Sequence, residues 1–199
     1  MKYLPENLSE ANIIDILSDI KHRVFPRPFE RLAVSGSDLV GVEIGVYKGE
    51  HSLSLLSNLS IKRLYLVDCY EMYEAYAEGH RHYGVDQAPL SVAEIEAKER
   101  LKSYDKNIVW IKDFSGNAIS KIKEKLDFVY IDGNHEESFV ADDIRNYIGA
   151  VKKGGVIGGH DFYNGFQREH DGVIEAVTKY AVQHDLRLQV ELPDWWIRV

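Results

Sequence analysis

The chain has 199 residues, of which 45% are hydrophobic and 28% are charged, a composition typical of one globular domain with a full core. The formal net charge of −8 argues against a nucleic-acid partner, because phosphate binding needs an excess of Lys and Arg. A single cysteine, Cys69, excludes an internal disulfide, and the sequence has neither an apolar run of about 20 residues nor a signal-peptide pattern, so we expect a cytoplasmic protein without a membrane segment.

The first part of the chain has helical spacing. Apolar residues at positions 13, 14, 17 and 20 lie on one helical face, with Ser9 as a suitable cap. Pro26 and Pro28 then interrupt the pattern. We therefore predict an N-terminal helical segment within residues 1–37.

Strand and helix patterns alternate along the rest of the chain. The predicted strands are 38–44, 63–68, 108–112, 128–131 and 155–159. The predicted helices are 52–59, 91–103, 117–125, 137–151 and 172–184, and Ser91 is expected to cap the second of them. This alternation predicts a parallel sheet with right-handed crossovers.

The tail of the chain predicts two further strands, 186–191 and 195–199. Too few residues join them for a crossover connection, so they must pair antiparallel as a hairpin. We expect an α/β fold with a Rossmann-like, doubly wound sheet of about seven strands, mostly parallel, that ends in this hairpin. The main domain would span residues 38–199, with an insert or lid over residues 69–105.

Acidic residues follow two of the predicted strands. Asp132 comes after the strand 128–131, and His160 and Asp161 come after the strand 155–159. Because parallel strands open into one crevice at their carboxyl ends, we expect these side chains and His135 to meet there. Paired carboxylates beside imidazoles suit a hard metal ion and a proton acceptor. The alternatives are that Asp132 only forms a turn, that His135 caps the next helix, and that His160 is a buried residue bonded to the chain.

A second motif follows the strand 38–44. Glu43, Gly45 and Gly49 form a turn before a helix, and Asp68 ends the next strand, where folds of this type place an acid on ribose hydroxyls. The dinucleotide fingerprint G-x-G-x-x-G is absent. The combination favours a ribose-bearing ligand, with a simple tight turn as the alternative.

Together these motifs resemble class I S-adenosylmethionine-dependent methyltransferases. The resemblance is carried by E-x-G-x-x-x-G at residues 43–49, by Asp68, by I-D-G-N-H at 131–135 and by G-G-x-x-x-x-H-D at 154–161. The last two motifs resemble the macrocin O-methyltransferase-like branch and, more distantly, catechol O-methyltransferase-like enzymes.

The resemblance implies a set of cofactor contacts. Gly45 and Gly49 would lie beside the methionine part of S-adenosylmethionine, Asp68 would hold the ribose, and Phe114 and Ser115 would border the adenine. Relatives often have Ser at position 51 to bind the methionine carboxylate, where this chain has His51 followed by Ser52. The full implied set is Glu43, Gly45, Tyr47, Gly49, His51, Ser52, Asp68, Phe114, Ser115 and Asp132.

The implied activity is O-methylation of a hydroxyl on a small molecule such as a sugar or a glycosylated metabolite. Asp132, His135 and Asp161 would be catalytic, with His135 as the general base. Asp132, Asp161 and His160 would be ligands of an optional Mg²⁺. Metal-using relatives often have two acids where this chain has His160 and Asp161, so a metal-free enzyme with His135 as its base is an alternative.

Several features leave other interpretations open. Tyrosines at 70, 73, 76 and 83 and the loop 162–170 could border an acceptor, cover the sheet edge or form a contact in a homo-oligomer. Asp143, in the middle of a predicted helix, favours a structural role, and Trp195 and Trp196 favour the core. The alternative functions are a catalytically silent cofactor-binding module and a nicotinamide-dependent oxidoreductase or epimerase; the missing fingerprint argues against the latter.

Overall fold

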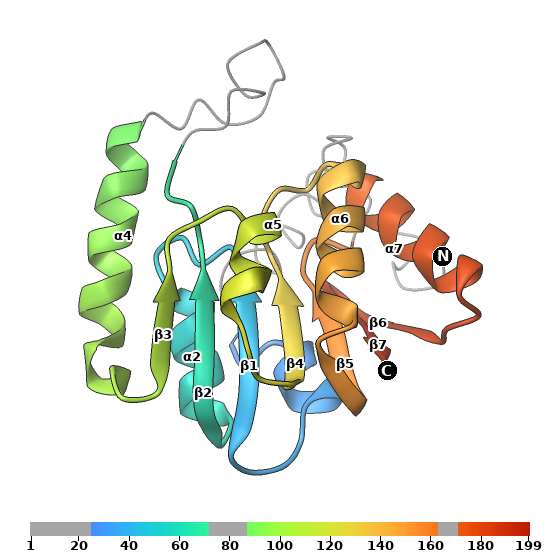
Figure 1. Cartoon of the computed structure of the whole chain (residues 1–199), viewed down its shortest axis with the longest axis horizontal. Helices are drawn as coiled ribbons and strands as arrows, with labels where there is room; N and C mark the ends of the chain where they lie inside the picture. Colours follow the sequence, from blue (N-terminus) through green and yellow to red (C-terminus); the bar gives the residue numbers. More distant parts are fainter. Residues whose placement is uncertain (1–24, 72–86, 163–170) are drawn as a thin grey trace, which may run out of the picture.

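Figure 1 shows the computed structural model of the chain, which describes residues 25–71, 87–162 and 171–199. The predicted helix around residues 8–20, three of the four tyrosines of the insert and most of the loop 162–170 lie outside these residues. The described part contains seven strands in one sheet.

The sheet has the predicted architecture. Its strand order is β3-β2-β1-β4-β5-β7-β6. All neighbours from β3 to β5 pair parallel, and β7 pairs antiparallel with both β5 and β6. The strands are β1 Leu39–Ile44, β2 Ile61–Val67, β3 Ile108–Ile111, β4 Leu126–Ile131, β5 Val151–Gly159, β6 Leu188–Glu191 and β7 Asp194–Arg198.

Helices cover both faces of the sheet (Figure 1). Apolar side chains of α5, α6 and α7 pack on one face, and those of η1, α2 and α4 pack on the other, so the sheet is doubly wound as expected. The helices are α2 Glu50–Asn58, α4 Gln87–Leu101, α5 Ser115–Ala118, α6 Glu137–Ile148 and α7 Asp171–Gln183. Shorter helical turns are η1 Phe29–Ala33, η2 Lys102–Tyr104 and η3 Ile119–Lys121.

Three predicted boundaries were wrong. The helix α4 begins at Gln87, so Ser91 lies inside it and does not cap it. The region predicted as helix 117–125 holds only the short α5 and η3. Strand β5 begins at Val151, because this residue pairs with Leu126 and the Lys152 ammonium lies 2.8 Å from the Asp127 carboxylate across the two strands. Val151 and Lys152 therefore belong to strand β5, and the predicted helix 137–151 is too long at its end.

Part of the segment 25–37 is buried against the sheet. The Phe29 side chain is fully buried, and its backbone N–H donates to Asp194 Oδ2 at 2.9 Å. The Glu30 carboxylate is also buried and accepts a hydrogen bond from Ser54 Oγ in α2 at 2.8 Å. This segment thus brings the Glu30 carboxylate into the interior beside α2. Trp195 and Trp196 are buried in the core, as predicted.

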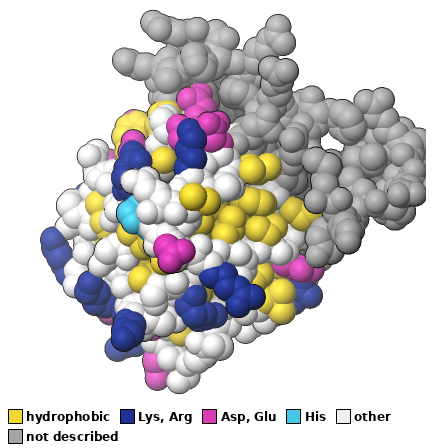
Figure 2. Space-filling model, turned by 90° about the vertical axis from the view of Figure 1, so that its right-hand side faces the viewer, with side chains coloured by type: hydrophobic (Ala, Val, Ile, Leu, Met, Phe, Trp, Pro, Cys, Tyr) yellow, Lys and Arg dark blue, Asp and Glu magenta, His cyan; other side chains and the backbone are white. Residues whose placement is uncertain are grey.

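The surface at the β6 edge carries exposed apolar side chains. Figure 2 shows hydrophobic side chains gathered in the middle of the face that lies on the right of Figure 1, where α7 and β6 are. Val182 in α7, Val190 in β6 and Leu192 in the turn between β6 and β7 are exposed. A homo-oligomer stays a prediction. None of the described helices is both long and apolar enough to span a membrane.

Candidate active site

Gly45 brings the turn after β1 into direct contact with the end of β4. Its φ is +85°, and a Cβ at this position would lie 2.1 Å from the Asp132 carbonyl oxygen. Only glycine fits, because any side chain would collide with fixed backbone. The same two strands are joined by a hydrogen bond from the Asp132 N–H to the Ile44 carbonyl at 2.8 Å. The glycine turn and the predicted catalytic strand end therefore form one unit.

Gly49 has a structural role at the start of α2. It adopts a left-handed conformation with a φ of +72° at the start of α2. A Cβ there would lie 3.1 Å from Leu101 and 3.3 Å from Ala97, both in α4. The space that this glycine leaves is thus turned toward α4. Gly49 thus serves the helix start and helix packing, and its place beside the cofactor stays a prediction.

Asp68 anchors the glycine turn. Its Oδ2 accepts hydrogen bonds from the N–H groups of Val46 and Tyr47, both at 2.9 Å, and its Oδ1 accepts one from the Tyr70 N–H at 2.8 Å. A carboxylate can accept about four hydrogen bonds, so little capacity remains for ribose hydroxyls. The ribose role of Asp68 stays a prediction, and the loop contacts give this residue a second, structural role.

Beneath the turn lies a buried group of acidic and imidazole side chains. Glu43 is 1% exposed, accepts a hydrogen bond from Ser52 Oγ and shares a hydrogen bond with His51 Nδ1 at 2.9 Å. Burial raises the pKa of the Glu43 carboxyl from 4.5 to about 8 and lowers the pKa of the His51 imidazole well below its ordinary value. Both groups therefore favour their uncharged forms near neutral pH.

His51 and Ser52 are directed at this buried group. Ser52 is fully buried, and the Nε2 atom of His51 lies 3.2 Å from Glu30 Oε1 without the geometry of a hydrogen bond. The His51 ring is 4.1 Å from the ring of Tyr130. Binding of a ligand carboxylate by His51 or Ser52 stays a prediction, but their present contacts are with protein.

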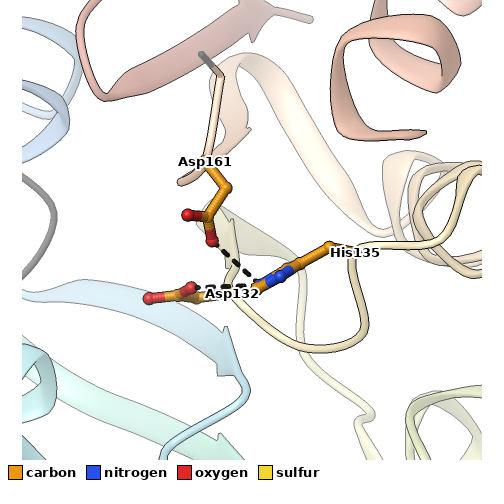
Figure 3. A group of neighbouring side chains, drawn as sticks. All are labelled: Asp132, His135 and Asp161. Carbon is orange, nitrogen blue, oxygen red and sulfur yellow. Dashed lines mark ion pairs between the residues drawn. The ribbon is translucent and has the colours of Figure 1, made fainter. Parts of the chain in front are cut away.

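The ends of β4 and β5 bring Asp132, His135 and Asp161 together. Figure 3 shows the three side chains pointing toward one another. His135 Nε2 lies 2.8 Å from Asp161 Oδ2 and 4.0 Å from Asp132 Oδ1. Asp161 has a φ of +59°, which is uncommon for a residue with a side chain and is often seen where function demands a particular placement. The prediction that these residues meet is confirmed.

Asp161 is held in its charged form. Burial alone would raise the pKa of this carboxyl, but the charges and hydrogen bonds of His135 and His160 outweigh burial and hold the pKa well below its ordinary value. The side chain is 4% exposed, whereas His135 is 27% exposed. An aspartate therefore lies behind a solvent-accessible imidazole and fixes its orientation.

His160 lies behind this pair. Its Nδ1 is 3.2 Å from Asp161 Oδ1 and 3.9 Å from Asp132 Oδ1, and its side chain is 4% exposed. Among the described residues, the group that could hold a metal ion consists of Asp132, His135 and Asp161, whose ligand atoms lie within 4.8 Å of one another. The candidate group thus contains His135, and metal ligation by His160 stays a prediction.

Two contacts position the loop that carries His135. Asn134 Oδ1 accepts a hydrogen bond from the Glu136 N–H at 2.9 Å, which closes the turn around His135. Gly172, near the start of α7, packs so closely that a Cβ there would lie 2.5 Å from the His135 carbonyl oxygen. The imidazole is therefore carried by a loop that is braced from both sides.

Arg27 is a site residue that the sequence analysis missed. Its Nη1 lies 2.9 Å from Asp132 Oδ2 and 2.7 Å from the Tyr130 hydroxyl. Because 105 positions separate Arg27 from Asp132, no local pattern could reveal the pair. The neighbouring motif Pro26-Arg27-Pro28 was noted only as an interruption of the helix.

These residues surround a cavity of about 490 Å³, a volume within the usual range for small-molecule sites. Its lining consists of Phe25, Arg27, Glu43, Gly45, Val46, Tyr47, Lys48, Glu50, His51, Asp132, Gly133, His135, His160 and Asp161. The glycine turn and the catalytic candidates thus share one hollow.

Phe114 and Ser115 lie away from this cavity, at the end of β3. Phe114 is 37% exposed, and Ser115 begins α5. Their contact with an adenine ring stays a prediction. Asp143 in α6 is buried and makes a side-chain hydrogen bond with Ser115, so its predicted structural role is confirmed.

The fold and the site define an α/β enzyme class whose ligand sits at the carboxyl ends of the parallel strands. The sequence matches the family described as "Methyltransferase domain" over residues 42–162, more than half of the chain. The chain therefore belongs to this family and is a class I S-adenosylmethionine-dependent methyltransferase. A search of curated proteins gives no significant match.

Solved structures share the fold. A protein assigned as a caffeoyl-CoA O-methyltransferase from Staphylococcus aureus has 14% identity and a TM-score of 0.61, covering 97% of this chain and 93% of that one. A Streptococcus mutans methyltransferase in complex with S-adenosylhomocysteine has 16% identity and a TM-score of 0.55, with coverages of 92% and 94%. An rRNA methylase from Streptococcus thermophilus has 15% identity and a TM-score of 0.52, with coverages of 88% and 96%. At these identities the similarity establishes the fold and leaves the acceptor open.

We predict that Glu43→Gln removes a pH dependence of stability. The unfolded carboxyl releases its proton near pH 4.5 and the folded one near pH 8, so between these values the folded state holds more protons and the wild type loses stability as pH rises. From about pH 5 to about pH 9 the difference in unfolding free energy between variant and wild type should shift by roughly 2–4 kcal/mol in favour of the variant. Urea unfolding at both pH values measures this. Glu191→Gln, at an exposed glutamate, serves as the control, and parallel pH profiles of Glu43→Gln and wild type would contradict the assignment.

We predict that Asp68 recognises ribose in addition to anchoring the turn. Wild type should bind S-adenosylhomocysteine about 10- to 100-fold more tightly than its 2′-deoxy analogue, because a hydrogen bond to a charged group is lost. In Asp68→Asn this preference should fall to a few-fold. Isothermal titration calorimetry of wild type and Asp68→Asn, each with S-adenosylhomocysteine and with its 2′-deoxy analogue, measures this preference. An unchanged preference in the variant would leave Asp68 with its loop role alone.

Proposed function

We propose that this methyltransferase transfers a methyl group to a hydroxyl oxygen of a small hydroxylated molecule, such as a sugar or a glycosylated metabolite. The observation that carries the proposal is the pairing of His135 with buried Asp161 at the edge of the cavity that contains the Gly45 turn. A hydroxyl needs a base to become a good nucleophile, and this pair supplies one.

The cavity suits the cofactor of the family. The Gly45 turn offers backbone without a side chain, and Val46 and Tyr47 beside it line the same hollow. These residues would hold the methionine part of S-adenosylmethionine, which when bound supplies an activated methyl group whose carbon–sulfur bond breaks as the new bond to oxygen forms. The chain's own residues must place the acceptor in line and remove its proton.

His135 is the proposed general base. In the neutral ring, the N–H at Nε2 donates a hydrogen bond to Asp161. The lone pair of the ring then lies on Nδ1, where it can accept the proton of the acceptor hydroxyl. Asp161 remains charged because its pKa is held low, so it stabilises the imidazolium that forms. Asp132, 4.0 Å from His135 Nε2, adds to the same stabilisation.

Mg²⁺ at this site stays a prediction that the geometry supports poorly. Mg²⁺ prefers oxygen ligands and near-octahedral geometry. Here Asp132 Oδ2 lies 2.9 Å from the Arg27 guanidinium, Asp161 Oδ2 lies 2.8 Å from His135, and the position after β5 is an imidazole. The carboxylate oxygens are thus already engaged by a guanidinium and an imidazole of the protein itself, so the mechanism above uses no metal ion.

The size and charge of the chain favour a small acceptor over nucleic acid. The cavity of about 490 Å³ suits a small molecule, and the net charge of −8 opposes a phosphate backbone. The paired His135 and Asp161 argue against a catalytically silent module, which needs no oriented base. Membership of the methyltransferase family argues against the nicotinamide-dependent alternative.

We predict that His135→Ala lowers turnover by about 10²- to 10⁴-fold, the usual contribution of a positioned base. Its affinity for S-adenosylhomocysteine should stay within a few-fold of wild type. The assay supplies S-adenosylmethionine with a panel of sugars, glycosides and catechols and measures S-adenosylhomocysteine. His184→Ala, at an exposed histidine of the same chain, is the matched control. Methyl transfer by His135→Ala at the wild-type rate would remove this residue from the mechanism, and binding without turnover on any acceptor would favour the silent module.

A further inference from the structure

We propose that Arg27 is the cation of this active site: it neutralises Asp132 and donates hydrogen bonds to the acceptor oxygen, and it does so in place of a divalent metal ion. The inference rests on the proposed function for the role of the acceptor. The claim about metal binding stands on the contacts of Arg27 alone and is testable without any acceptor.

Toward the described residues, the guanidinium of Arg27 uses one of its three nitrogens. One nitrogen, Nη1, makes both described contacts, with Asp132 Oδ2 at 2.9 Å and with the Tyr130 hydroxyl at 2.7 Å. No described residue accepts a hydrogen bond from Nε or Nη2, and Arg27 lines the cavity. The side chain is 12% exposed. Arg27 thus borders the hollow in which the acceptor of the proposed function would lie.

The position of the guanidinium is fixed by its surroundings. It lies 5.4 Å from the centre of the Phe25 ring and 5.6 Å from that of Tyr130. The Tyr130 hydroxyl donates to Asp194 Oδ1 at 2.9 Å, and Asp194 Oδ2 accepts the Phe29 N–H, so the arginine is bound to a buried network. Donors held in place before the reaction are the ones that stabilise developing charge most effectively.

The same arrangement disfavours a divalent ion. Asp132 belongs to the candidate metal group, and a cation coordinated there would meet the positive charge of Arg27 on the same carboxylate. Arginine keeps its proton at any working pH, so it cannot relieve this repulsion by becoming neutral. The ion would therefore have to displace a buried ion pair before it could bind.

In the methyl-transfer step the arginine would act on the oxygen. The acceptor proton moves to His135, the oxygen forms a bond to the methyl carbon, and the electron pair of the breaking carbon–sulfur bond stays on sulfur. Negative charge on the oxygen is greatest as the proton leaves, and the guanidinium stabilises it at that moment. The charge of Asp132 holds the guanidinium in place throughout.

The test is a titration of the protein with Mn²⁺, followed by the loss of the free-ion signal in electron paramagnetic resonance. Four proteins are compared: wild type, Arg27→Gln, Arg27→Lys and Arg31→Gln. Arg31 is an exposed arginine in the same segment and is the matched control. Thermal melts establish that each variant is folded, and calorimetry with S-adenosylhomocysteine reports the cofactor site separately.

We expect weak Mn²⁺ binding by wild type, Arg27→Lys and Arg31→Gln, and an affinity at least about tenfold higher for Arg27→Gln, because the competing charge is gone. Affinity for S-adenosylhomocysteine should change by only a few-fold. If Arg27→Gln does not fold, weak binding by wild type together with weak binding by Arg27→Lys still supports the proposal.

Two results would overturn it. Tight Mn²⁺ binding by wild type would show that the ion displaces the arginine. A loss of S-adenosylhomocysteine affinity of about 30-fold or more in Arg27→Gln, without a gain in Mn²⁺ affinity, would assign the guanidinium to the methionine carboxylate of the cofactor. Failure to find an acceptor would weaken the proposed function and leave both binding results valid.

Discussion

The close contact between the Gly45 turn and the backbone of Asp132 and Gly133 is the constraint on which the site depends. It lets the end of β1 and the end of β4 meet without side chains between them, and a Cβ at Gly45 would fall 2.1 Å from the Asp132 carbonyl oxygen. The turn that would hold the cofactor and the strand end that carries the catalytic candidates are thereby fixed relative to each other. Asp68 reinforces the arrangement, since it binds the next two N–H groups of the turn.

Charge at the site is organised in two layers. In the buried layer, Glu43 and His51 favour uncharged forms, because burial raises the pKa of the acid and lowers that of the imidazole. In the cavity layer, the groups are paired: Arg27 with Asp132, and the His135 imidazole with the Asp161 carboxylate. The division into two layers keeps net charge out of the core. His135 and Arg27 line the cavity, where the proposed methyl transfer to a hydroxyl would use them as base and cation.

The sequence predicted most of the fold and the centre of the site, because both follow from local periodicity and from the rule that parallel strands end at one edge. Asp132, His135 and Asp161 were placed together for this reason. The packing of Gly49 against α4 was not predicted, since a glycine pattern does not tell which neighbour uses the space. Ser91 was misplaced because α4 begins one turn earlier than its cap motif suggested. Arg27 escaped notice because its contact with Asp132 exists only in the folded chain.

The central claim is that the cofactor's sulfur lies in the cavity between the Gly45 turn and the His135–Asp161 pair. A crystal structure of the protein with S-adenosylhomocysteine tests this most directly. The account predicts density for the homocysteine part against the Gly45–Tyr47 backbone, with the sulfur facing the space between Arg27 and His135. Density for the ligand outside this cavity, or with its sulfur turned away from the ends of β4 and β5, would contradict the account.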